Sequence, residues 1–170
     1  PMGSEVTMIE SPIFKVKAAG SFRQKPGCPS DNLSNLSPDR IDFLCSGECY
    51  HPSDERHAIK KIEVIKITPQ EFKGEPVKEL IFDVWKSFDC PLDNQFCELT
   101  FSDEAFTRDS IYYVRAIQSE TLAINGKQIH INENDEIEIC RGSYKTNKED
   151  DCLFPLSERA WSSPIFINKP

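Results

Sequence analysis

No long stretch of this 170-residue chain carries a helical hydrophobic period, and this absence constrains the fold more than any other feature. Apolar residues gather instead in short segments, either alternating with polar residues or rich in β-branched side chains. Prolines and turn-forming residues separate these segments. Many short strands with turns between them favour an antiparallel β-sandwich. We therefore expect a mostly β fold with long loops and at most one or two short helices.

The strongest strand signals lie in the central part of the sequence. Ile59 to Ile67 is β-branched with apolar residues on both faces, as expected in the middle of a sheet. Ile111 to Ile117 is apolar on both faces apart from Arg115. Shorter strands or strand arms are expected at Phe14–Ala18, Leu80–Trp85, Glu98–Phe101, Gln128–Ile131, Glu136–Cys140 and Ala160–Ile167.

Residues 28–57 contain several cysteines and are predicted to form a long loop, because Pro, Ser, Asn and Asp are frequent there. Within this loop Ser37 could cap a short helix that has Pro38 at its first position. At roughly 150 residues per domain, the length fits a single β-rich region, 1–170, with its main strands at 59–167. Because the first residue is Pro1 rather than Met, we expect a part of a longer protein.

Charge and hydropathy exclude two classes of function. The chain has 20 basic and 28 acidic side chains and a net charge of −8, which repels phosphate backbones. No apolar run approaches the roughly 18 residues that span a bilayer. We therefore expect neither a nucleic-acid partner nor a membrane span.

Cysteine is frequent, with 7 residues, and the spacing of these residues favours disulfides. Six of them fall into close sequence pairs, whereas Cys28 stands apart; the pairs are Cys45 and Cys49, Cys90 and Cys97, and Cys140 and Cys152. None forms the C-x2-C knuckle of a zinc ribbon, and each pair brackets turn-forming residues. Disulfides imply an oxidising compartment, so we expect an extracytoplasmic protein, periplasmic or secreted. An odd count leaves at least one thiol free or bonded outside the chain.

A metal site is the alternative for part of this cysteine set. Cys45, Cys49, His51 and His57 supply suitable zinc ligands in a C-x3-C-x-H-x5-H pattern. The single residue between Cys49 and His51 crowds a tetrahedral site, however. We favour a disulfide beside two surface histidines.

Catalytic patterns are weak throughout. The 3 histidines form no H-x-H or H-E-x-x-H motif of a hydrolytic metal centre. Ser53, Asp54 and His57 lie in one loop without a G-x-S-x-G elbow, so a turn is the better interpretation. The acidic stretches at 132–136 and 149–151 do not follow a calcium-loop pattern. We assign no catalytic and no cofactor-binding residue to this chain.

Aromatic side chains offer a possible binding face. Trp85, Trp161, Tyr112 and Tyr113 could line a sugar-binding groove, although aromatic residues on such strands are more often core.

Several segments together are characteristic of a known family. The most specific are Tyr112-Tyr-Val-Arg-Ala116 and Ala160-Trp-Ser-Ser-Pro-Ile-Phe166. Others follow in order along nearly the whole chain: Ala18-Ala-Gly-Ser-Phe22, Lys25-Pro-Gly-Cys-Pro29, Cys45-Ser-Gly-Glu-Cys49, Pro52-Ser-Asp-Glu-Arg-His57 and Asp150-Asp-Cys152. These segments resemble the carboxy-terminal portion of domain-of-unknown-function family 3604.

The resemblance implies a relation to the polymerase-and-histidinol-phosphatase (PHP) superfamily of metal-dependent phosphoesterases. Members are larger, carry an export signal and hold their candidate metal ligands upstream of the part that this chain resembles. No family metal or catalytic residue can therefore be carried onto this sequence, and a divalent metal is expected only in the upstream half. The chain would be a non-catalytic accessory portion whose partner is that half. The alternative is an independent extracellular binding module for glycan or protein.

The resemblance also implies a set of disulfides. Family members often carry two further cysteines where this sequence has Lys127 to Ile139, and their joint loss leaves Cys140 to pair with Cys152. We therefore expect two local bonds, Cys90–Cys97 and Cys140–Cys152, and a third between Cys28 and either Cys45 or Cys49.

Overall fold

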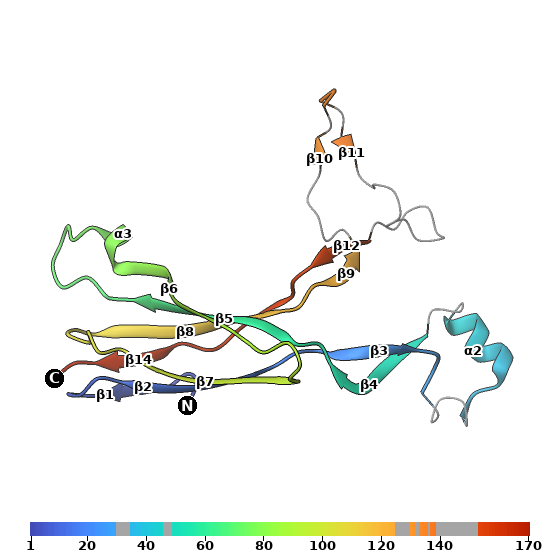
Figure 1. Cartoon of the computed structure of the whole chain (residues 1–170), viewed down its shortest axis with the longest axis horizontal. Helices are drawn as coiled ribbons and strands as arrows, with labels where there is room; N and C mark the ends of the chain where they lie inside the picture. The colour runs from blue at the N-terminus through green and yellow to red at the C-terminus, as the bar shows by residue number, and fades with distance from the viewer. Residues whose placement is uncertain (30–34, 46–48, 125–129, 132, 136, 139–152) are drawn as a thin grey trace.

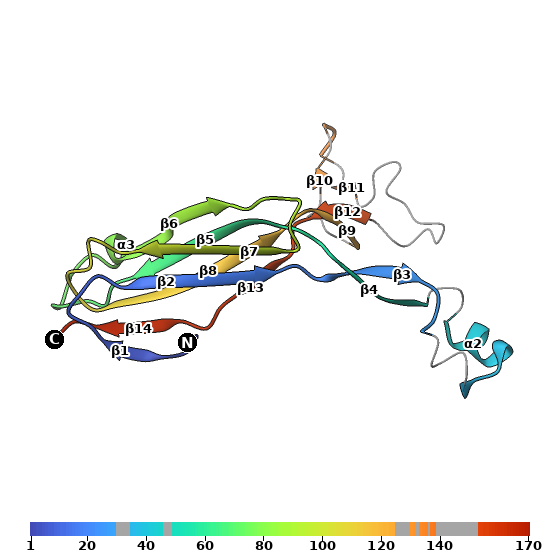
Figure 2. The same ribbon diagram turned by 60° about the horizontal axis from the view of Figure 1, so that its bottom comes forward.

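The computed structural model describes residues 1–29, 35–45, 49–124, 130–131, 133–135, 137–138 and 153–170. About 50% of the chain is strand and 10% is helical, so the mostly β expectation is confirmed. Two packed layers of strands form the body, and a long narrow arm extends from one end of it (Figures 1 and 2).

The larger layer is a mainly antiparallel sheet. It runs in the order β1 (Glu5–Thr7), β14 (Ile165–Asn168), β8 (Ser110–Gln118), β5 (Ile59–Ile67) and β6 (Ile81–Asp89). A short strand, β13 (Arg159–Trp161), pairs with β8 on the same edge as β14. The two terminal strands β1 and β14 are the parallel pair.

The predicted central strands have the expected places. β5 lies between β8 and β6 and buries Ile62, Val64 and Ile65 completely. The last predicted strand is divided at Ser162, upstream of Pro164. Ser162 bridges the break because its amide donates to the Val114 carbonyl at 3.0 Å and its hydroxyl accepts from the Val114 amide at 3.1 Å.

The second layer consists of β2 (Ile13–Ala19) and β7 (Phe96–Ser102), which pair in an antiparallel ladder. Alternation along β2 turns Phe14 toward the large sheet, where its ring packs against Tyr112 of β8 with centroids 4.7 Å apart. The Phe14 ring also stacks on Phe101 of the neighbouring strand β7 with centroids 4.9 Å apart. The core between the layers is made of Phe14, Val64, Phe101, Phe106, Tyr112 and Ile167. Burial of these apolar side chains is the main stabilising contribution to the body.

The arm is formed by two strands that continue out of the body. β3 (Phe22–Pro26) follows β2, β4 (Tyr50–Arg56) leads into β5, and the two pair in an antiparallel ladder. A helix, α2 (Pro38–Cys45), lies at the far end (Figure 1). Every residue of β3 is exposed, and α2 buries none. The arm therefore has almost no core of its own.

Two expectations for residues 28–57 have different outcomes. The short helix is confirmed, because the Arg40 amide donates to the Ser37 hydroxyl at 3.3 Å and α2 begins at Pro38. The loop prediction is wrong for residues 50–56, which form β4. This polar segment is paired by backbone hydrogen bonds, and such pairing leaves no apolar alternation in the sequence.

The remaining elements are short. α3 (Val77–Leu80) is a single turn, so the strand that was expected from Leu80 begins at Ile81. β9 (Thr121–Ile124) pairs with β12 (Leu153–Leu156), and β10 (His130–Ile131) pairs with β11 (Ile137–Glu138). The rest of the two predicted arms at 128–131 and 136–140 lies outside the described residues. Among the helices that the structure describes, none has the length and apolar character to cross a membrane.

Candidate functional site

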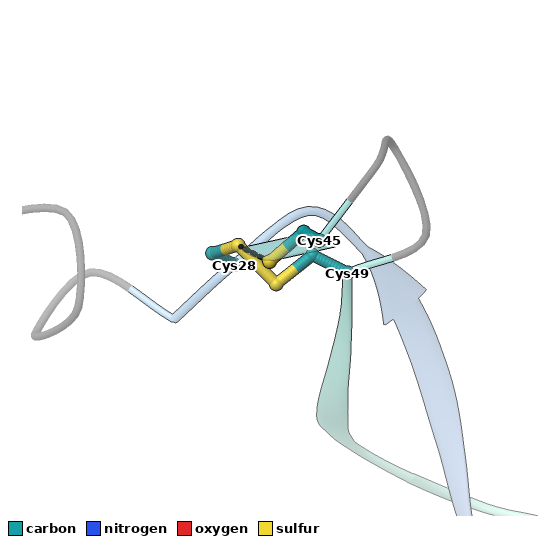
Figure 3. A group of neighbouring side chains, drawn as sticks. All are labelled: Cys28, Cys45 and Cys49. Atoms are coloured by element: carbon teal, nitrogen blue, oxygen red, sulfur yellow. Dashed lines mark hydrogen bonds between the residues drawn. A yellow bond between two sulfur atoms is a disulfide. The ribbon is translucent and has the colours of Figure 1, made fainter. Parts of the chain in front are cut away.

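Three cysteines meet at the far end of the arm (Figure 3). Cys28 follows β3, Cys45 ends α2 and Cys49 precedes β4; their sulfur atoms lie within 4.8 Å of one another. Cys28 and Cys49 form a disulfide with a Cα–Cα distance of 5.1 Å. Cys45 is a free thiol, and its Sγ lies 3.3 Å from Cys28 Sγ. All three residues are half-buried.

The register of the arm explains why these sulfurs converge. Pro26 faces Tyr50 in the β3–β4 ladder, so Cys28 and Cys49 come to the open end of that ladder. Gly27, at φ +97°, makes the turn there, and its amide donates to the Cys49 carbonyl at 2.7 Å. α2 then returns the chain so that its last residue, Cys45, lies against the disulfide.

The zinc set predicted from sequence is not assembled in this arrangement. Cys45 and Cys49 do lie together, but Cys49 is bonded to Cys28. His51 Nδ1 is occupied by a 2.8 Å hydrogen bond with the Gly27 carbonyl. His57 follows the far end of β4, which at 3.3 Å per residue places it about 26 Å along the chain from Cys49.

A second disulfide joins the two layers of the body. Cys90, at the end of β6, is bonded to Cys97 in β7 with an S–S distance of 2.02 Å, and both residues are buried. Of the bonds expected from the sequence, the structure therefore contains Cys90–Cys97 and, for Cys28, the bond to Cys49. The expected Cys140–Cys152 bond lies outside the described residues. Two disulfides indicate an oxidising environment.

An apolar cleft of about 550 Å³ opens between β2 and the edge of β8 and β13. Tyr112, Tyr113 and Trp161 line it, and Trp161 is 58% exposed. Tyr112 reaches the cleft from the core, where it is buried and the Trp85 ring packs against it with centroids 5.8 Å apart. Three of the four predicted aromatic residues therefore meet at this cleft, and Trp85 does not line it.

A buried ionic network, which sequence reasoning missed, lies between the layers. Asp103, only 1% exposed, accepts hydrogen bonds from the Lys66 ammonium, from the Tyr112 hydroxyl at 2.5 Å and from the Ala105 amide at 3.1 Å. Burial alone would raise the pKa of Asp103, but the hydrogen bonds from Lys66 and Tyr112 lower it below its usual range. Burial, together with its hydrogen bond to Asp103, raises the pKa of Tyr112.

Two further ion pairs of the body are partly buried. Arg108 contacts Glu75 at 2.7 Å, and its hydrogen bond lowers the pKa of that carboxyl to about 2. Arg115 contacts Glu63 at 2.7 Å. The Glu75 carboxylate is therefore held in its ionised form at neutral pH and is suited to pairing rather than to proton transfer.

The residues weighed as catalytic or calcium-binding candidates form no catalytic or calcium site in the part of the chain that the structure describes. Ser53 accepts a hydrogen bond from the Glu55 amide at 3.1 Å, which is the local turn contact expected of it. Of the acidic stretch at 132–136, residues 133–135 are described and exposed, and the stretch at 149–151 lies outside the described residues.

Comparison of the chain with protein-family models, with curated proteins and with solved structures finds no match in any of the three.

Proposed function

We propose that this chain is the non-catalytic accessory portion of a larger exported PHP-like metal-dependent phosphoesterase, and that it packs against the upstream catalytic half. The observation that carries the proposal is an excess of surface. The chain exposes 12138 Å², whereas a compact monomer of this size exposes about 8500 Å². Surface of this extent is expected of a body that is completed by another one.

The exposed apolar side chains indicate where the upstream half would pack. On the arm, Phe43 is 74% exposed, and Leu44 and Tyr50 are also exposed. Because α2 buries no residue, these side chains contribute nothing to a core within the described chain. We infer that the upstream half covers these exposed apolar side chains.

The ionised side chains support a structural rather than a catalytic role. The lowered pKa values of Asp103 and Glu75 keep these carboxylates charged, whereas a general acid or base works best with a pKa near the operating pH. In this proposal the divalent metal and the chemistry belong to the upstream half.

Association in trans tests the proposal. The chain and the separately produced upstream half should form a one-to-one complex in sedimentation, and binding of a hydrophobic dye to the chain should fall when they meet. Phe43→Ser with Leu44→Ser should weaken the complex at least tenfold, and the melting temperature of the body should stay unchanged because both side chains are exposed. A chain that binds no dye and does not associate would contradict the proposal.

The cleft beside Trp161 favours a second candidate, an independent extracellular binding module. Its volume of about 550 Å³ falls within the range of about 300–1000 Å³ typical of ligand sites, and its aromatic lining suits the apolar face of a sugar ring. Titration with a glycan panel should then quench Trp161 fluorescence, and Trp161→Ala should abolish glycan binding. The matched control is Phe43→Ser, which lies on the arm and should leave glycan binding unchanged.

A further inference from the structure

We propose that Cys28, Cys45 and Cys49 form a thiol–disulfide exchange site, in which the Cys45 thiolate attacks Cys28 and releases Cys49. This inference depends only on the geometry of the three sulfurs, so it does not rest on the proposed accessory role. The proposed exchange gives a chemical role to Cys45, the free thiol beside the disulfide.

Proximity is the first argument. Cys45 Sγ lies 3.3 Å from Cys28 Sγ, which is within the roughly 3–3.5 Å that separates reacting atoms poised for attack. Cys28 Sγ is at the same time bonded to Cys49. The Cys28 sulfur therefore contacts a competing thiol while it is bonded to its present partner (Figure 3). Because all three sulfur atoms lie within 4.8 Å of one another, the Cys45 side chain has to rotate to reach the in-line position opposite Cys49.

The step balances within the chain. Cys45 loses its proton to water, and the thiolate attacks Cys28 Sγ through a three-sulfur transition state. The Cys28–Cys45 bond forms as the Cys28–Cys49 bond breaks, and the electron pair goes to Cys49 Sγ, which takes up a proton. One disulfide and one thiol are present before and after, so no oxidant or reductant is required.

The placement of the trio explains what exchange would change. The Cys28–Cys49 bond closes the mouth of the β3–β4 ladder, whereas a Cys28–Cys45 bond would tie the last residue of α2 to the end of β3. The free thiol would move from the helix to the start of β4. Because the residues are half-buried on an arm without a core, an external thiol or disulfide reagent can reach either position.

A soft metal ion on three thiolates is the competing use of the same sulfurs. It requires the Cys28–Cys49 bond to be reduced first, since only Cys45 of these three residues is a thiol. An oxidising environment disfavours that reduction, and exchange needs no such step.

Alkylation of the oxidised, full chain tests the proposal. The protein is treated with one equivalent of iodoacetamide at pH 8 without reductant, quenched in acid and digested with pepsin for peptide mapping. We expect label on both Cys45 and Cys49, together with both the Cys28–Cys49 and the Cys28–Cys45 cross-linked peptides. Cys49→Ser, folded with oxidised glutathione as the oxidant, should form the Cys28–Cys45 bond quantitatively.

Cys45→Ser is the matched control. It keeps the Cys28–Cys49 bond but removes the attacking thiol, so label on Cys49 should disappear. The buried Cys90–Cys97 bond provides an internal reference within the same digest and should take no label in any variant.

Three results would overturn the proposal. The first is wild-type label confined to Cys45 with Cys28–Cys49 as the single linkage of the trio. The second is label on Cys49 that persists in Cys45→Ser, because another group would then be the attacking one. The third is one equivalent of tightly bound zinc with all three thiols reduced in protein purified without chelator.

Discussion

Replacing Asp103 by asparagine should destabilise the sandwich by about 3–5 kcal/mol, the usual cost of removing one partner of a buried ion pair. The substitution keeps the shape of the side chain and removes its charge. Lys66, 9% exposed, would then lie between the layers without a counter-charge. The ring centroids of Trp85 and Tyr112 lie 5.3 and 5.7 Å from its ammonium, but cation–π contacts of about 2 kcal/mol do not replace the charge of the carboxylate.

The size of this loss is large relative to the stability of a typical domain, about 5–15 kcal/mol. For a chain of this length it corresponds to a fall in melting temperature of roughly 6–20 °C. Urea unfolding followed by Trp fluorescence would measure the loss as a shift of the transition midpoint at constant slope.

A double-mutant cycle separates the charge from the shape. Lys66→Met with Asp103→Asn should be less destabilised than Asp103→Asn alone, because the unpaired ammonium is then absent. Glu98→Gln is the control: its partner Lys17 is 2.6 Å away, but both side chains are exposed, so the urea midpoint should not move. A loss below about 1 kcal/mol for Asp103→Asn, or a cycle without coupling, would refute the buried-pair argument.

The pH dependence of the unfolding free energy tests the role of Asp103 independently. The native pKa of Asp103 lies below its unfolded value of about 3.9, so its contribution is fully present above that pH. The contribution is lost as the pH falls through the native pKa, because protonation then favours the unfolded chain. Asp103→Asn should therefore show a weaker dependence of unfolding free energy on pH below about 4 than the wild type.

Two further substitutions test other parts of the structure. Gly20→Ala should lower the free energy of unfolding in urea by more than about 3 kcal/mol, because the added Cβ would lie 1.9 Å from the His57 carbonyl oxygen. A urea midpoint equal to that of the wild type would contradict this steric clash. Gly27→Ala is the comparison on the arm: its Cβ meets open space, but φ +97° strains alanine, so a smaller loss of about 1–2 kcal/mol is expected. Joint replacement of Cys90 and Cys97 by alanine should lower stability by about 2.5 kcal/mol for a loop of this size, and an unchanged midpoint would contradict it.

The sequence predicted the strands that form the core because those strands carry an apolar signal. Ile59–Ile67 and Ile111–Ile117 are dense in β-branched and aromatic residues, and they became β5 and β8. The segment His51 to Arg56 carries no such signal, since β4 pairs with β3 through backbone groups whose pattern does not depend on side-chain type.

The candidate sites were less predictable because they depend on residues distant in sequence. Lys66 and Asp103 meet across two layers and 37 positions, and neither residue alone indicates a partner. The sequence predicted part of the cysteine cluster, because the short spacing of Cys45 and Cys49 indicated that these two residues are close. Only the register of the arm shows that Cys28 is bonded to Cys49 and leaves Cys45 as the thiol.

The parallel pairing of β1 with β14 has a mechanical consequence. Glu5 faces Phe166 and Thr7 faces Asn168, so the chain enters through β1 and leaves through β14 in the same direction. Tension applied between the segment before β1 and the segment after β14 would load this ladder in shear, and its hydrogen bonds would have to rupture together rather than one at a time. We therefore expect the sandwich to resist mechanical unfolding when it is pulled from these two ends.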